Sequence, residues 1–188
     1  MSKIPTRDEA LAIYNKHNSN EALLKHALNV EGVMRYFARK YGEDEGYWGV
    51  VGLLHDLDYE NYPEEHCKKV VELLEADDIS PDIIRSVVSH GYELCADVKP
   101  EHIMEKVLYA TDELTGLVAA AALMRPSKSV MDLEYKSLWK KYKSPAFAAG
   151  VDRSVIEKGC DMMGVELKVL IEDVILAMRE VEAKGIVD

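Results

Sequence analysis

A histidine and an aspartate, His55 and Asp56, directly follow the apolar run of residues 50–54. Side chains at the end of such a run are expected to be buried, and burying an unpaired charge is costly. A divalent metal ion removes this conflict, because it uses an imidazole and a carboxylate as ligands. We therefore interpret the pair as part of a metal site, which requires further ligands elsewhere in the chain.

Other predicted helices carry four more candidate ligands, namely His26, His66, His90 and Asp112. Considered alone, His26 and Asp112 could be hydrogen-bonded core residues. His66 could be a surface residue, and His90 could be favoured by the dipole at a helix C-terminus. Together, however, the six candidates fall on five consecutive predicted helices, near or within their apolar faces. Mixed nitrogen and oxygen ligation suits iron, manganese, cobalt, nickel or zinc.

The order of these residues, H…HD…H…H…D, resembles the HD superfamily of metal-dependent phosphohydrolases over about residues 20–120. The resemblance implies that one divalent ion is bound by His26, His55, Asp56 and Asp112. One subset of the superfamily has two further histidines that hold a second ion, and the HD aspartate bridges both ions. His66 and His90 match that subset in order and approximate spacing, so the resemblance implies two ions.

The chain departs from several motifs of the superfamily. Many members read HDIG where this chain reads HDLD at residues 55–58. Mononuclear nucleotidases often carry a catalytic glutamate where this chain has Tyr59, so their mechanism does not transfer as it stands. Signalling members add a GYP motif, whereas residues 91–93 read GYE. The dinuclear pattern is similar to that of the hydrolases that act on symmetrical dinucleoside tetraphosphates, so the resemblance implies a diphosphate-bridged nucleotide as a first substrate.

The resemblance and the ligand set predict a metal-dependent phosphohydrolase that acts on a small phosphate ester or nucleotide through a metal-activated water. Asp58, in the turn after the HD pair, is the candidate catalytic residue as a base or proton shuttle, with a helix-capping role as the alternative. Arg125 is the candidate substrate-binding residue, because within the locally basic stretch 125–143 it is nearest the helix that carries Asp112. A solvated helix face is the simpler interpretation of that stretch.

Two other functions stay open at this point. Some HD proteins with the same six ligands are di-iron oxygenases that cleave C–C or C–P bonds. A metal-stabilised regulatory domain without turnover is the second alternative, although the complete ligand set disfavours it, because a degenerate sensor commonly loses ligands.

Sequence signals for helices extend through most of the chain. The predicted helices must position the candidate ligands. A capping box at residues 6–9 opens a first helix that ends near residue 17, and the segment of residues 18–20 caps a second that extends to Gly42. Further helices are predicted near 44–55, after the turn 58–63 with His66 on the helix, 81–91, 100–124 with Pro126 beyond its end, 129–142, 152–163 and 166–184. Because strand-like alternation is absent, we predict an all-α HD-domain helical bundle with additional C-terminal helices, folded as one domain over residues 1–188.

Composition limits the partners of the chain. Its 188 residues, of which 48% are hydrophobic, suffice for one well-buried core. A formal net charge of −11 argues against general nucleic-acid binding. No apolar run reaches the ~20 residues of a membrane span, and no signal-peptide pattern is visible. Cys67, Cys95 and Cys160 lack CxxC spacing and are interpreted as reduced thiols. We therefore expect a cytoplasmic protein whose partner is a small phosphorylated molecule.

Overall fold

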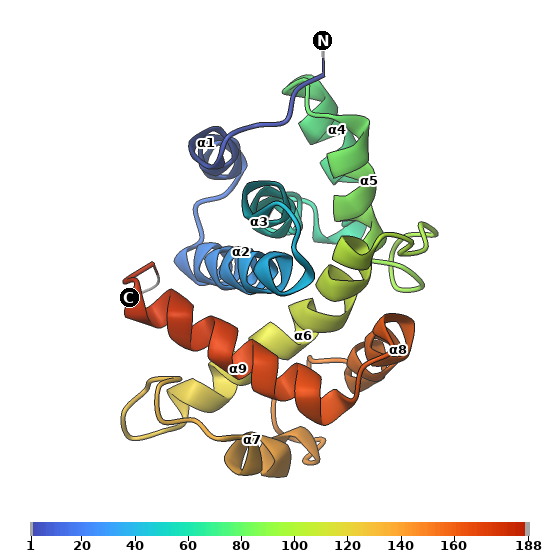
Figure 1. Cartoon of the computed structure of the whole chain (residues 1–188). Coiled ribbons are helices and arrows are strands. Elements are labelled where there is room, and N and C mark those ends of the chain that lie inside the picture. The colour runs from blue at the N-terminus through green and yellow to red at the C-terminus, as the bar shows by residue number, and fades with distance from the viewer. Residues whose placement is uncertain (1, 187–188) are drawn as a thin grey trace.

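Helices make up the regular secondary structure of residues 2–186, the part of the chain that the computed structural model describes (Figure 1). In this range β-type pairing is limited to two isolated bridges, Lys3 with Ile79 and Tyr92 with Ala96. The predicted all-α class is confirmed. Within the same residues, no helix combines the length and the apolar character that crossing a membrane requires.

The first two helices begin at the residues that the sequence predicts. In α1 (Arg7–His17), Thr6 accepts a hydrogen bond from the backbone of Glu9, and the Glu9 side chain accepts one from the Thr6 backbone. In α2 (Glu21–Tyr41), Asn20 accepts hydrogen bonds from two backbone N–H groups, and the helix ends at Gly42 with φ of 72°. The buried face of α2 includes Ala27, Val30, Val33, Met34 and Phe37.

Helix α3 (Glu45–Leu54) carries the HD pair into the interior. All of its residues from Trp48 to Leu54 are buried, and His55 is its C-cap. A Cβ atom at Gly52 would lie 2.8 Å from Met34 Cγ and 3.0 Å from the Val30 carbonyl oxygen. The missing side chain therefore allows α3 to approach the backbone of α2 closely.

The prediction that His66 lies on a helix is wrong. A short 3-10 turn, η1 (Pro63–Glu65), precedes it, His66 has an extended ψ of 141°, and Cys67 has a φ of 65°. Helix α4 (Lys69–Ala76) begins later, because the distant Asp58 carboxylate accepts the hydrogen bond from Val70 N in its first turn. Helix α5 (Pro81–Ser89) begins at the predicted Ser80 cap and ends at His90.

The long helix α6 (Ile103–Leu123) runs from the side of α5 toward the C-terminal helices (Figure 1). These are α7 (Tyr135–Tyr142), α8 (Arg153–Met163) and α9 (Leu167–Ala183). α8 packs on α6, and α9 packs on both α2 and α6. The helix predicted near 129–142 is shorter than expected, because Ser129 and Val130 N hydrogen-bond Glu182 in a loop that precedes α7.

Candidate metal centre

Four of the predicted ligands converge at the end of α3. His26 comes from α2, Asp112 from α6, and the HD pair from the C-cap of α3. His26 Nε2 lies 2.9 Å from Asp112 Oδ1, and His55 Nε2 lies 3.2 Å from Asp56 Oδ2 and 3.3 Å from Asp112 Oδ1. Ligand atoms of one ion lie about 3–3.5 Å apart when each metal bond is about 2.1 Å. These four side chains therefore fit one first-row metal ion.

A second group of ligands adjoins the first through Asp56. Its Oδ1 atom lies 3.5 Å from His66 Nε2 and 3.4 Å from His90 Nε2, and these two nitrogens are 3.2 Å apart. Asp56 thus directs Oδ2 toward one group and Oδ1 toward the other, which is the arrangement of a carboxylate that can bridge two ions. The structure brings all six predicted ligands together.

Hydrogen bonds at the opposite ring nitrogens fix how three of the histidines face the centre. Nδ1–H of His55 donates to the Gly52 carbonyl at 2.7 Å, and that of His90 donates to the Val87 carbonyl at 2.5 Å. His66 Nδ1 pairs with Asp58 Oδ1 at 2.7 Å. These contacts leave each Nε2 atom directed at the centre, as hydrogen bonds to the far ring nitrogen do for histidines that bind a metal.

His55 Nε2 provides a direct test of whether these residues fit an ion. The atom is buried and, among the described residues, it makes no hydrogen bond. Buried polar atoms are rarely left without a partner unless an unseen ion or water supplies one. A cation between His55, Asp56 and Asp112 satisfies this nitrogen and both carboxylates, so the donor set fits a bound metal ion.

The charged states of His55 and Asp56 depend on each other. Burial lowers the pKa of His55, but the carboxylates of Asp56 and Asp112 outweigh it and raise that pKa well above its ordinary value. Burial raises the pKa of Asp56, but His55 and His90 outweigh it and hold that pKa well below the ordinary range. The carboxylates thus remain charged and require positive charge nearby, which protons or a metal ion can supply.

The centre lies in the wall of a cavity of about 410 Å³. Apart from the ligands, the wall is largely apolar or aromatic and contains one ionisable carboxylate. Burial and the adjacent Asp112 raise the pKa of this residue, Glu113, to about 7. No lysine or arginine is among the described residues that form this wall, which are Leu23, His26, Asp56, Tyr59, Pro63, His66, His90, Gly91, Leu94, Cys95, Tyr109, Asp112, Glu113, Gly116, Val151 and Val155.

The other two predicted site residues do not reach the cavity. Asp58 is fully buried behind His66, and its carboxylate is shared between His66 Nδ1 and Val70 N. In this position Asp58 is better placed to orient the His66 imidazole than to act as a base toward a reacting water. Arg125 binds Asp132 through Nε at 2.7 Å and Nη2 at 3.0 Å, and it is absent from the residues that form the cavity wall.

Sequence reasoning missed Glu113 and the pairing of two cysteines. Glu113 directly follows Asp112 on α6, and only Asp112 matches the order of the family's ligands. Cys95 Sγ lies 2.8 Å from Cys67 Sγ, although 28 positions separate the two residues in the chain. No local motif such as CxxC announces this contact, because it depends on how the segments after η1 and α5 pack together.

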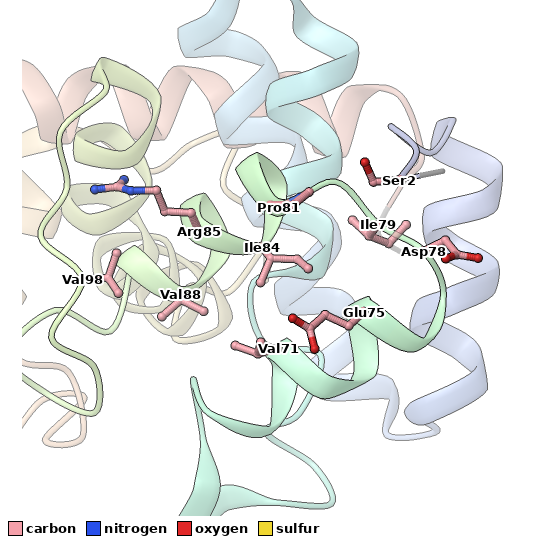
Figure 2. A pocket seen from close by; sticks show the side chains of 10 residues that line it. All are labelled: Ser2, Val71, Glu75, Asp78, Ile79, Pro81, Ile84, Arg85, Val88 and Val98. Carbon is pink, nitrogen blue, oxygen red and sulfur yellow. The ribbon is translucent and has the colours of Figure 1, made fainter.

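A second cavity, of about 420 Å³, lies between α4 and α5 (Figure 2). Its wall is mainly aliphatic and includes no histidine, and its Arg85 side chain is paired with Glu101 and Glu105. Its two carboxylates, those of Glu75 and Asp78, have no imidazole beside them among the described wall residues, so this cavity lacks the mixed donor set found at the end of α3. The chemistry of the described residues is concentrated in the cavity beside α3.

The family model described as HD domain matches residues 23–123, a range that includes all six predicted ligands. No curated protein and no solved structure matches the chain.

Proposed function

The chain belongs to the HD domain family, and we propose that it is a metal-dependent phosphohydrolase that acts on a small phosphate ester or nucleotide. One observation carries this proposal: six imidazole and carboxylate groups converge beside one cavity, five of them in its wall and His55 buried next to it, and Asp56 directs an oxygen toward each half of the set. Family membership supports hydrolysis, because most HD domains are metal-dependent hydrolases.

We assign the ligands to two ions. His26, His55, Asp56 and Asp112 would hold the first, and His66, His90 and Asp56 would hold the second. Divalent ions bound there would supply the activation of a water molecule and the neutralisation of phosphoryl charge. The chain itself contributes orientation, because Asp58 and the carbonyls of Gly52 and Val87 fix the imidazole rings.

The cavity wall favours one substrate class within this proposal. Each additional phosphate of a polyphosphate brings negative charge, and the described residues of the wall include no lysine or arginine to neutralise it. Tyr59, Tyr109 and Leu94 instead provide aromatic and aliphatic surface. We therefore infer that a monophosphate ester with an apolar or aromatic group fits better than a diphosphate-bridged dinucleotide.

The test combines metal analysis with a phosphatase and nucleotidase panel. The chain, loaded in turn with manganese, cobalt, iron, nickel or zinc, is expected to release phosphate from aryl monophosphates faster than from nucleoside triphosphates or dinucleoside tetraphosphates. Asp56→Ala should lose both ions and all turnover. His102→Ala is the matched control, because this histidine caps α6 and lies outside the centre.

Other outcomes would redirect the assignment. Turnover that persists after complete loss of metal would contradict the proposal. Because the ligand set also suits iron, oxygen consumption by the iron-loaded protein without anaerobic phosphate release would favour a di-iron oxygenase. Metal binding without either reaction would favour a regulatory domain.

A further inference from the structure

Two thiols meet beside the second group of metal ligands. The Cys95 thiol hydrogen-bonds to Cys67 Sγ at 2.8 Å. A Cβ atom at Gly91 would lie 2.4 Å from both sulfur atoms, so the glycine leaves the space in which they meet. Cys160 lies elsewhere, on α8, and is buried. The contact therefore involves a specific pair among the three cysteines of the chain.

The two sulfur atoms differ in their access to solvent. Cys95 is partly exposed and contributes to the wall of the cavity, whereas Cys67 is only 2% exposed. The loop after His90 holds Cys95 in place, since the Gly91 carbonyl accepts hydrogen bonds from the backbone N–H groups of Leu94, Cys95 and Ala96. A small reagent in the cavity thus reaches Cys95 first, with Cys67 directly behind it.

We propose that Cys67 and Cys95 are a reversible modification site that closes to a disulfide by exchange with a low-molecular-weight disulfide. The Cys95 sulfur, as thiolate, attacks the small disulfide and releases one small thiol, which leaves a mixed disulfide on Cys95. Cys67 then attacks the Cys95 sulfur and releases the second small thiol. Two protein thiols are oxidised, one small disulfide is reduced to two thiols, and the protons of the cysteines pass to the released thiols.

This link joins the two segments that carry the second group of ligands. Cys67 follows His66 directly, and its Sγ atom lies 4.0 Å from His90 Nε2. The site does not depend on the proposed hydrolysis, because the same thiols are adjacent whatever reaction the cavity supports. His66, Cys67 and His90 also present their ligand atoms within 4.8 Å of one another. The alternative to a disulfide-forming Cys67 is therefore a Cys67 that binds a metal ion.

The experiment uses the full chain with its metal bound and 2-hydroxyethyl disulfide as the oxidant. After treatment, the protein is unfolded in acid, its remaining thiols are alkylated with a maleimide, and its intact mass is measured. We expect one alkylated thiol, assigned to Cys160, and a peptide pair linked through Cys67 and Cys95. A reductant should restore all three thiols.

Matched variants identify each step. Cys67→Ser should stop the reaction at the mixed disulfide on Cys95, which adds the mass of one half of the reagent. Cys160→Ser should form the internal link as the natural chain does and leave no thiol to alkylate. The proposal is overturned if the natural chain keeps three free thiols, if Cys160 is found in the link, or if the link forms only after a chelator removes the metal.

Discussion

Asp58 has no exposed surface, and its carboxylate is shared between the ring of His66 and the first turn of α4. A carboxylate behind a ligating imidazole holds the ring in position and raises its basicity, and loss of such a partner typically weakens metal affinity about 10–100-fold. We therefore expect Asp58→Asn to weaken binding of the second ion by that factor. Occupancy measured by elemental analysis at limiting metal should fall while the first ion stays bound.

Asp132→Asn is the control for this change, because Asp132 is exposed and paired with Arg125 away from the cavity. The Asp132→Asn protein should keep both ions. If Asp58→Asn instead keeps full occupancy and loses about 10²–10⁴-fold in turnover, Asp58 acts in proton transfer, as its sequence position indicated.

The raised pKa of Glu113 predicts that the stability of the metal-free protein depends on pH. Burial and Asp112 raise its pKa to about 7, so the folded chain binds this proton more tightly than the unfolded chain does. The resulting stabilisation is complete below the ordinary carboxyl pKa and is lost as the pH rises through about 7. In chelated protein, Glu113→Gln should therefore raise the melting temperature at pH 8 and change it little at pH 5.

The exposed Glu134 offers a comparison, because Glu134→Gln should shift the melting temperature by a similar small amount at both pH values. An equal shift for Glu113→Gln at pH 5 and pH 8 would mean that Glu113 is ordinarily ionised in the folded chain.

At the scale of residues, the sequence singled out six side chains that the structure brings together, but it did not indicate their surroundings. Histidine and aspartate next to apolar runs are recognisable, since few other roles justify burying them. The contact between Cys67 and Cys95 and the direction of the Asp58 side chain depend on packing between separate segments. No periodicity or local motif encodes such contacts.

Among the elements, the approach of α3 to α2 positions the HD pair. A Cβ atom at Gly52 would lie 2.8 Å from Met34 Cγ and 3.0 Å from a backbone oxygen of α2. Overpacking of this kind costs about 1–3 kcal/mol. We expect Gly52→Ala to lower the melting temperature and, by displacing the end of α3, to lower the metal content as well.

Gly116→Ala provides the contrast within α6. Nothing lies within 4 Å of its Cβ position, so the substitution should stabilise the helix by about 0.5–1 kcal/mol. Equal melting temperatures for the two variants would indicate that α2 and α3 separate easily and that the glycine is not needed for their contact.

The start of a helix was predictable where its cap is local. Thr6, Asn20 and Ser80 each accept hydrogen bonds from the first turn of the helix that follows them. The start of α4 was not predictable, because Asp58 supplies its capping carboxylate from twelve positions before Val70. His66 consequently lies in an extended segment whose sequence resembles the beginning of a helix.

In the whole molecule, the helices beyond the family match complete the cavity. The match ends at residue 123, yet Val151 and Val155 contribute to the cavity wall. Helix α9 also packs against α2, where Asp173 hydrogen-bonds Tyr36 and pairs with Lys40. The C-terminal helices therefore support the ligand-bearing core from one side and add apolar surface to the cavity, which is where substrate selection within a shared metal centre is expected to arise.

The proposed metal centre would join segments that are distant in the sequence, and this predicts how the stability of the whole chain responds to metal. The ligands extend from residue 26 on α2 to residue 112 on α6, and His66 and His90 lie on the segments between. An ion that binds only the folded state stabilises it by mass action, by about 2.7 kcal/mol when free metal is at 100 times its dissociation constant. A chelator should therefore lower the melting temperature measured by calorimetry, and His26→Ala should show a smaller response because one ligand of the first ion is missing.

His102→Ala, which removes a side chain that lies outside the centre, should respond to the chelator as the natural chain does. An unchanged melting curve after elemental analysis has verified removal of the metal would mean that packing among α2, α3 and α6 holds the ligands together without an ion.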